Sequence, residues 1–394
     1  MSHEAVIVST ARTPIATAFK GSLIETDAFT IATLTVAESV RRSGLDPALV
    51  DDVVLGESLY GGGAIARYAA IEAGLVHAPG IAHNRHCASG LGTLSTAAAS
   101  VMAGMDRVVV AGGVQSTSTS PKAVRRVPGT DFVDEDWLSP SHPATDDAPI
   151  RDMTITVGWN AARKAGISRE DLDAWAYRSH MRAIGGIDSG AFADEIVAVP
   201  VTLRDGTSFS FDTDEHPRRS SSLEKLASLK PLHPEIEGFS ITAGNSAGVN
   251  DGAAAMVVAD RDFAIANGAP VLATVKSWAS AGVTPADTGL APPVAIRKAL
   301  ERAGLTVGDI DLWEINEAFA SVPIAAVREL GLDEDLVNPL GSGCSLGHPV
   351  AMTGSRMAMT LVHELRRRGG GLAVAAMCAG GGMASAVILE VPAP

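Results

Sequence analysis

The chain has 394 residues, which exceeds the size of one simple domain, so two or three domains are expected. Its composition is 46% hydrophobic and 4% aromatic with 40 glycines, which predicts a closely packed globular protein and excludes a disordered or fibrous one. The net charge is −14, and no run of Lys and Arg is longer than residues 366–368, which excludes the basic surface of a nucleic-acid-binding protein.

Continuous apolar runs without alternation mark the predicted strands, at residues 5–9, 51–56, 107–113 and 370–378. Such runs are typical of strands that are buried on both faces of an α/β sheet.

Residues 1–14 have neither the basic region nor the apolar run of a signal peptide, so we expect a cytoplasmic protein.

The segment after Cys87 has no charged residue up to Gly104 and is small or apolar on every side. A helix that covers one face of a sheet needs a polar outer surface, whereas a helix buried all round does not. We therefore expect this helix to lie between two sheets, in a layered stack.

The chain contains the same unit twice. Residues 44–57 (GLDPALVDDVVLGE) and 304–317 (GLTVGDIDLWEINE) align without a gap. In both halves a glycine-bearing loop, a helix and an apolar strand that ends in glycines come next. The shared order of elements indicates an internal duplication.

Residues 119–245 separate the two copies and differ from them in character. They begin with a stretch rich in Pro, Ser and Asp and continue with an amphipathic helix near 168–183. A segment of this length exceeds a normal connection, so we predict an inserted subdomain with a functional use.

One segment, residues 372–391, has the length and hydropathy of a membrane span. Gly380, Gly381 and Gly382 interrupt it, and a glycine triplet in mid-span favours a strand, a turn and a second strand. We therefore expect no membrane partner.

The three cysteines, Cys87, Cys344 and Cys378, form no CxxC pair, so thiols are expected and not a disulfide framework. A lone cysteine with apolar neighbours is most often a small buried side chain. Cys87 also fits a second interpretation, because free N–H groups and the dipole at a helix start favour a thiolate. His348, in a glycine-rich loop, fits both a loop cap and a general base.

Four separated segments hold the candidate chemical groups: 83–90 (HNRHCASG), 314–320 (EINEAFA), 341–349 (GSGCSLGHP) and 377–385 (MCAGGGMAS). With 6–23 and 241–258, in this order and spacing, they resemble the thiolase family of acyl-CoA C-acyltransferases over essentially the whole chain.

The resemblance implies an α/β architecture, the thiolase fold, which is a duplicated five-layer αβαβα stack with an inserted loop subdomain. The N-terminal half is expected at 1–118, completed by about 246–268, and the C-terminal half at 269–394. The inserted subdomain, 119–245, is expected to cover the CoA site.

The resemblance also implies roles in a ping-pong transfer from a 3-ketoacyl-CoA to CoA, or in the reverse condensation. Cys87 carries the acyl group, His348 takes the thiol proton, and Cys378 is the acid or base at the α-carbon of acetyl-CoA. The N–H groups of Cys87 and Gly380 hold the acyl oxygen, and Asn316 orients a water that stabilises the enolate oxygen with His348. Without the resemblance, Asn316 is equally consistent with a turn residue at the end of a strand.

The resemblance places substrate contacts at Arg218 for the CoA nucleotide, at Ser246 beside the pantetheine position, and at Met153 and Phe319 for the acyl group. A solvated charge pair with its neighbour is the alternative for Arg218, and a core position is the alternative for Phe319. Thr288 stands where acetoacetyl-specific members commonly have methionine, which predicts room for longer or bulkier acyl groups.

Other positions also depart from the family. Asp152 replaces a histidine before Met153, Ala247 replaces a serine that contacts pantetheine, and Ala351 replaces a glycine. Cys344, in a predicted strand, is assigned a packing role. These departures affect the CoA contacts more than the catalytic groups.

CoA and acyl-CoA are the expected partners, both as substrates, with no cofactor and no metal. The family generally assembles through its N-terminal half, so a homodimer or homotetramer is expected. Three alternatives stay open: a decarboxylating condensing enzyme of the ketoacyl-synthase type, a non-catalytic acyl-CoA or lipid-binding relative, and a Cys-His hydrolase. The second cysteine, Cys378, argues against the first and the third, and the complete catalytic set argues against the second.

Overall fold

A ten-stranded sheet joins the two copies of the repeated unit in the computed structural model, which describes residues 3–60 and 62–393. The strand order is β12-β13-β14-β11-β1-β10-β5-β3-β4, and the short β2 (Ala16–Thr17) pairs with β10. The N-terminal half-sheet consists of β1 (Ala5–Arg12), β3 (Asp52–Gly56), β4 (Gly80–His83), β5 (Val108–Ser116) and β10 (Asn250–Asp260). The C-terminal half-sheet consists of β11 (Ala273–Gly282), β12 (Leu312–Ile315), β13 (Gly371–Ala379) and β14 (Met383–Val391).

The two half-sheets repeat one topology, which confirms the predicted duplication. In the first, β3 and β5 are parallel and β10 is antiparallel to β5 and β1. In the second, β12 and β13 are parallel and β14 is antiparallel to β13 and β11. The halves join where β1 pairs with β11, through Val6 with Thr274 and Ile7 with Ala273.

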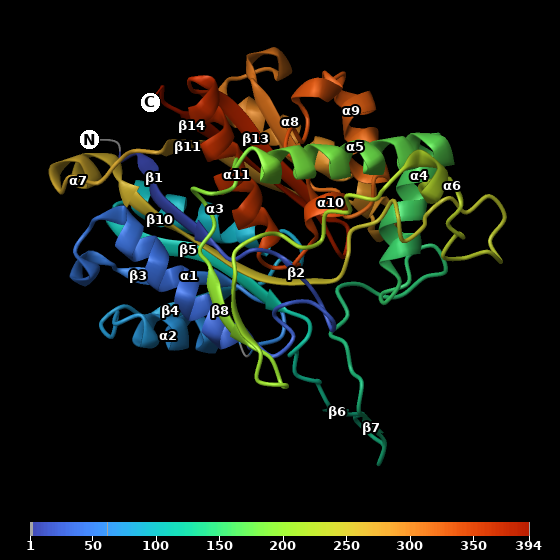
Figure 1. Cartoon of the computed structure of the whole chain (residues 1–394), viewed down its shortest axis with the longest axis horizontal. Coiled ribbons are helices and arrows are strands. Elements are labelled where there is room, and N and C mark those ends of the chain that lie inside the picture. Colours follow the sequence, from blue (N-terminus) through green and yellow to red (C-terminus); the bar gives the residue numbers. More distant parts are fainter. Residues whose placement is uncertain (1–2, 61, 394) are drawn as a thin grey trace.

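Helices form three layers around the half-sheets (Figure 1). The central layer consists of α3 (Ser89–Met102) and α11 (Thr353–Arg368), which pack on each other and on both half-sheets. On the outer faces lie α1 (Ala28–Ser43) and α2 (Gly63–Glu72) in one half, and α8 (Pro292–Ala303) and α9 (Ser321–Leu330) in the other. The uncharged helix after Cys87 therefore lies between the two half-sheets, as predicted, but it is not buried all round, because Thr96, Ala99 and Met102 are exposed.

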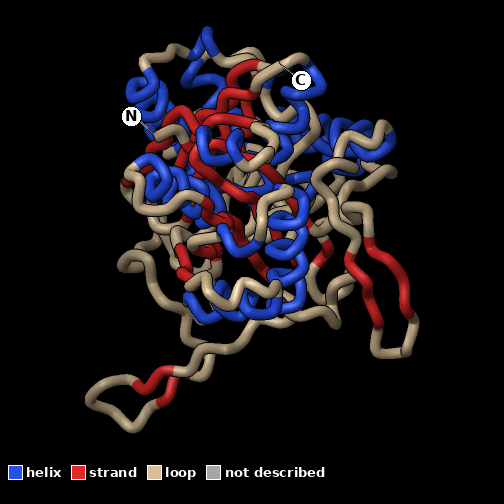
Figure 2. Tube along the Cα trace, turned by 90° about the vertical axis from the view of Figure 1, so that its left-hand side faces the viewer, coloured by secondary structure: helices blue, strands red, loops and turns tan. Residues whose placement is uncertain are grey.

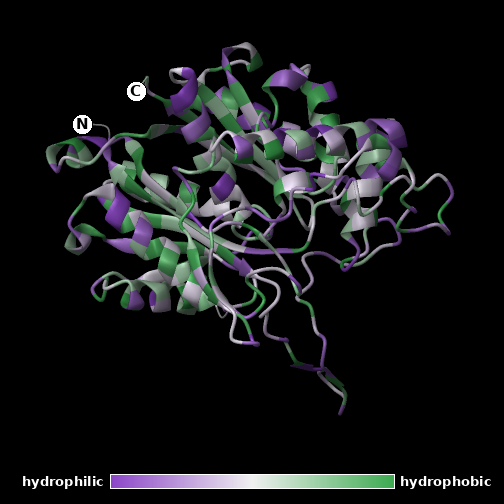
Figure 3. Ribbon diagram, in the orientation of Figure 1, coloured by the Kyte–Doolittle hydropathy of each residue, from purple (hydrophilic) through white to green (hydrophobic). Residues whose placement is uncertain are grey.

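Hydropathy follows these layers: the central strands are largely hydrophobic, and polar residues gather on the outer helices and loops (Figure 3). Residues 372–391 form β13, a glycine turn and β14, which confirms the predicted hairpin. Within the described residues, no helix combines the length and the apolar character that a membrane crossing requires.

Residues 119–245 pack over one side of the stack. They contain α4 (Asn160–Lys164), α5 (Arg169–Asp188), α6 (Leu223–Ala227), a π-helical turn at Thr154–Trp159, and the hairpins β6 (Arg125–Arg126) with β7 (Val133–Asp134) and β8 (Val199–Thr202) with β9 (Ser208–Phe211). The β6–β7 hairpin projects from the body of the molecule (Figures 1 and 2).

Arg12 of β1 fastens this segment to the sheet. Its fully buried guanidinium binds Glu195 and Asp214, each at 2.8 Å. A buried cation without these partners would be costly, so the two carboxylates hold residues 195 and 214 against the core. The boundaries 1–118, 119–245 and 269–394 stay a prediction.

One predicted element is wrong. Cys344 lies in the short helix α10 (Gly343–Leu346) and not in a strand. Gly341 and Gly347, both with positive φ, bound this turn, and the Cys344 N–H donates to the Glu317 carboxylate. The segment is buried, which made it resemble a strand in the sequence, but the glycines allow the backbone to turn and form a short helix instead.

Candidate active site

A cavity of about 470 Å³ lies where the two half-sheets and the inserted segment meet. Six residues that sequence reasoning assigned to the site line it: Cys87, Met153, Phe319, His348, Cys378 and Gly380. Residues from five stretches of the chain, 86–87, 117–157, 247–249, 318–350 and 378–380, therefore meet at one place.

Cys87 lies in the tight turn between β4 and α3. The residue before it, His86, has a φ of 46°, which is uncommon for a side chain other than glycine. Ser89 locks the turn, because its hydroxyl accepts the Arg85 N–H at 2.9 Å and donates to the His86 carbonyl at 2.6 Å. This turn presents the Cys87 sulfur at the cavity, at the start of a buried helix.

The pKa of Cys87 corrects one expectation. Burial raises the pKa of the Cys87 thiol, although the backbone N–H groups of Gly380 and of Cys87 itself oppose the rise. Desolvation therefore outweighs the helix start, and Cys87 rests as a thiol. Its proton must leave when the sulfur attacks, so a base has to lie within reach.

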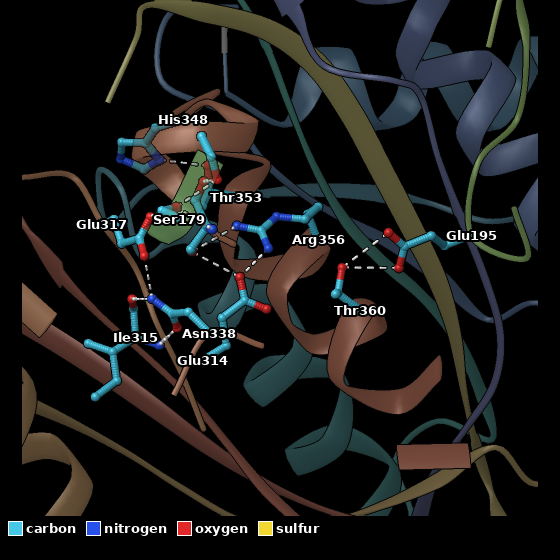
Figure 4. A network of polar contacts seen from close by, with 12 residues as sticks. Ser179, Glu195, Glu314, Ile315, Glu317, Asn338, His348, Thr353, Arg356 and Thr360 are labelled. Carbon is cyan, nitrogen blue, oxygen red and sulfur yellow. Dashed lines mark hydrogen bonds and ion pairs between the residues drawn. The ribbon is translucent and has the colours of Figure 1, made fainter. Parts of the chain in front are cut away.

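His348 lines the same cavity and has the properties that a base needs. Its Nδ1 lies 2.6 Å from the Thr353 hydroxyl oxygen, its backbone N–H donates to Asn250, and its Nε2 is buried with no protein partner (Figure 4). Burial and then the nearby Arg356 lower the pKa of His348 to about 4, so the ring is neutral near pH 7. A neutral ring with a free nitrogen in the cavity can accept a proton.

Cys378 ends β13 and is 2% exposed. Burial raises the pKa of Cys378, and the neighbouring Cys87 raises it further. Two thiols thus lie close together, and each keeps its proton in the resting site. A thiol with an elevated pKa is a weak acid that can protonate a strongly basic carbanion.

Asn316 is fully buried and does not line the cavity, although Ala318 and Phe319 do, and neither atom of its side-chain amide has a hydrogen-bond partner in the protein. Gly343 makes room for it, because a Cβ there would lie 2.8 Å from Asn316 Oδ1. Buried polar atoms in native proteins are nearly always paired, so an unpaired amide two residues before the cavity wall indicates a group that binds water or substrate.

The neighbouring Glu317 fixes this loop, and sequence reasoning assigned it no role. Its buried carboxylate accepts four hydrogen bonds, from Trp175, Ser179, Asn338 and the Cys344 N–H. Figure 4 shows Glu317 with Ser179 and Asn338. A second buried pair, Glu314 with Arg356, lies beside it and receives a hydrogen bond from Ser342. The only sequence signal was the position of Glu317 directly after Asn316.

Three residues expected at the substrate, Arg218, Ser246 and Thr288, do not line this cavity. Ser246 is buried and its hydroxyl donates to the Thr242 carbonyl at 2.7 Å. Thr288 is fully buried, and its hydroxyl donates to Pro285 and accepts the Gly382 N–H at 2.9 Å. Thr288 therefore supports the turn after Cys378 from behind.

Arg218 lies at a separate cavity of about 310 Å³, which Lys225 and several serines also line. Its backbone N–H donates to His180, and both His180 and the neighbouring His216 have pKa values that burial lowers to about 4. The two histidines are thus neutral, and Arg218 and Lys225 supply the positive charge of this cavity.

His86 and Arg151 also line the catalytic cavity, although neither was assigned to the site from the sequence. Burial lowers the pKa of His86 and keeps it neutral. Its place directly before Cys87 was the available signal. Arg151 had none, because it is one of many charged residues in a polar segment.

The arrangement offers a nucleophilic thiol, a neutral imidazole and a second thiol in one cavity. This set can transfer an acyl group through a thioester and can move a proton at a carbon atom. No group of three or more His, Cys, Asp or Glu side chains that could hold a metal ion occurs among residues 3–60 and 62–393.

Comparisons with known proteins agree with this chemistry. Residues 5–262 match the family described as "Thiolase, N-terminal domain", and residues 269–391 match "Thiolase, C-terminal domain". The acetyl-CoA acetyltransferase of Pseudomonas aeruginosa is 40% identical, over 98% of this chain and 99% of its own. The crystal structure of the Bacillus anthracis acetyl-CoA acetyltransferase superposes with a TM-score of 0.90 at 38% identity, over 99% of both chains. Human mitochondrial 3-ketoacyl-CoA thiolase in complex with CoA superposes with a TM-score of 0.89 at 32% identity, over 99% of this chain and 98% of its own.

Proposed function

The chain belongs to the thiolase family and is an acyltransferase with thiolase activity, and we propose that it transfers the acyl group through a thioester on Cys87. The observation that carries this proposal is the single cavity that Cys87, His348 and Cys378 share. The match over both halves of the family also sets aside the decarboxylating condensing enzyme and the Cys-His hydrolase.

Cleavage of a 3-ketoacyl-CoA begins at Cys87. Its sulfur attacks the C3 carbonyl carbon while its proton passes to His348 Nε2. The C2–C3 bond then breaks, C2 keeps the electron pair, and Cys378 gives its proton to C2, which releases acetyl-CoA. A CoA thiol next gives its proton to the Cys378 thiolate and attacks the acyl thioester. Cys87 leaves and recovers its proton from His348, so the cycle needs no cofactor.

Two groups of hydrogen-bond donors would stabilise the substrate oxygens that become negatively charged during the reaction. The N–H groups of Cys87 and Gly380, which act to lower the pKa of the Cys87 thiol, would bind the acyl oxygen. Asn316 and protonated His348 would bind the enolate oxygen of acetyl-CoA, directly or through water. The support for this second site is that the Asn316 amide and His348 Nε2 are buried polar atoms without protein partners.

The proposed function is tested by measuring whether the enzyme uses CoA to cleave a panel of 3-ketoacyl-CoA thioesters. Wild type should release acetyl-CoA together with the shortened acyl-CoA, and Cys87→Ala should release neither. A folded wild-type protein that binds CoA without cleaving any chain would instead support the non-catalytic relative.

We propose that the acyl group extends beyond four carbons. The cavity of about 470 Å³ supports this, and its wall carries no side chain from Thr288. Acetoacetyl-CoA turning over far better than every longer 3-ketoacyl-CoA would contradict it.

Arg218 and Lys225 are the proposed cations for the CoA phosphates.

We propose a cytoplasmic homodimer or homotetramer that forms through the N-terminal half. The support is that β4 is the end strand of the sheet order and that its Ile81 is 50% exposed, which leaves an apolar strand edge open to pairing. The three cysteines are free, as expected in a reducing compartment. Light scattering on the purified chain would test the assembly.

A further inference from the structure

One permanent charge reaches the catalytic cavity. Among its lining residues in the described chain, Arg151 is the only Arg, Lys, Asp or Glu. The other titratable groups there, His86, Cys87, His348 and Cys378, have pKa values shifted toward their neutral forms. A substrate in this cavity therefore meets a neutral reaction centre and a wall that includes one arginine.

The backbone at Arg151 is firmly held. The next residue, Asp152, accepts the Thr154 N–H at 3.0 Å and contacts His233 Nε2 at 2.7 Å, which ties it to two other parts of the inserted segment. On the other side, the Pro149 carbonyl accepts the Thr156 hydroxyl at 2.9 Å. Arg151 thus extends from a fixed point of the cavity wall.

The guanidinium itself has a replaceable partner. It binds the side chain of Asp136 at 3.0 Å and also the Asp136 carbonyl, but the Arg151 side chain is 57% exposed and that of Asp136 is 86% exposed. An ion pair this open to water contributes little, so another carboxylate can take the place of Asp136. Another acidic residue, Asp146, lines a neighbouring cavity that Arg151 also lines, but Asp146 does not line the cavity of Cys87.

CoA does not need this charge for its phosphates, since Arg218 and Lys225 are available at the second cavity. Arg151 is left as a cation on the wall of the cavity that also holds Cys87, with no assigned use. A planar guanidinium matches a carboxylate through two parallel hydrogen bonds. An acyl chain that ends in a carboxylate, rather than a methyl group, would use it.

Resting on the proposed function, we propose that the enzyme acts on 3-ketoacyl-CoA thioesters whose acyl chain ends in a carboxylate, and that Arg151 binds this carboxylate. Arg151 is then a residue that determines specificity and takes no part in the chemical steps.

The test compares 3-ketohexanoyl-CoA with its analogue of equal length that ends in a carboxylate, each cleaved by CoA with the purified enzyme. Wild type should prefer the carboxylate substrate in kcat/KM by about tenfold, as expected for a hydrogen-bonded charge pair. Arg151→Gln should abolish this preference by raising KM for the carboxylate substrate alone. Asp136→Asn, which removes the competing carboxylate, should lower the same KM.

Arg126→Gln is the matched control, because Arg126 is an exposed arginine of the same segment outside the cavity. It should leave the preference unchanged. A uniform rise in the KM for CoA with Arg151→Gln would show that Arg151 binds a CoA phosphate and would overturn the proposal. Turnover of the methyl-ended chain alone would also overturn it while leaving the proposed function intact. Turnover of neither chain would refute both.

Discussion

His348 and Thr353 are joined by a hydrogen bond of 2.6 Å that fixes the state of the imidazole. The Thr353 hydroxyl donates its single proton to the Pro349 carbonyl at 2.8 Å, so it accepts from His348 and Nδ1 must carry the ring proton. Nε2 is then left with its lone pair at the cavity, where the Cys87 proton has to go.

Thr353→Val should therefore impair catalysis without unfolding the protein. Valine keeps the shape of threonine but cannot hold Nδ1–H, so the reactive tautomer is no longer enforced. We expect kcat to fall about tenfold or more, which is part of what a general base contributes, and stability to fall by about 1 kcal/mol for the lost hydrogen bond. Thr353→Ser is the control and should retain most activity. Wild-type kcat in the valine variant would contradict the tautomer argument.

Cys378→Ala should separate the two chemical steps. In loading from an acyl-CoA, Cys378 only returns a proton to the leaving CoA thiolate, and water can supply that proton instead, so intact mass should still show the acyl adduct. Exchange of the α-protons of acetyl-CoA with deuterated water should fall by about 10²- to 10⁴-fold, because the acid/base at carbon is missing. Loss of the adduct together with exchange would show that Cys378 also supports acyl loading.

The pH dependence of alkylation should report the raised pKa of Cys87, which burial causes. Only the thiolate reacts, and below the pKa its fraction grows tenfold with each pH unit. The rate of iodoacetamide labelling at Cys87 should therefore keep rising from pH 7 to beyond pH 9. A plateau near pH 7 would mean that the helix start outweighs burial after all.

Stability should fall on acidification from pH 7 to pH 5. His180, His216 and His348 have folded pKa values of about 4, below the ordinary 6.5, so the unfolded chain takes up three more protons in this range. Glu314 opposes them, because burial raises its folded pKa to about 7 and the folded state then holds one proton more. The net uptake of two protons on unfolding costs up to about 2.7 kcal/mol per pH unit between pH 4.5 and 6.5. A urea midpoint at pH 5 equal to or above that at pH 7 would contradict this balance.

Local patterns were enough to predict the sheet strands and the buried helix after Cys87, because burial on both sides leaves apolar runs that any window of the sequence shows. Cys87, His348 and Cys378, which the structure brings to one cavity, could be proposed as site residues because the short motifs around them resemble those of thiolases. The Cys87 pKa could not be predicted, since it depends on desolvation by residues from the other half of the chain.

Side-chain direction was the other limit. Thr288 and Ser246 were assigned to the pocket by their places in motifs, but both turn their hydroxyls to nearby backbone groups. Arg151 reaches the cavity because a long inserted segment folds over it, and no periodicity in the sequence carries that information. Glu317 likewise depends on partners more than 100 residues away, such as Trp175 and Ser179.

The most direct test of the account is the intact mass of the protein after incubation with acyl-CoA thioesters, from acetyl to long, branched and carboxylate-ended chains. The account predicts an increase by one acyl group in wild type, located at Cys87 by peptide mapping and absent from Cys87→Ala. Cysteine-independent labelling, or no adduct from any acyl-CoA on folded protein that binds CoA, would contradict the thioester on Cys87.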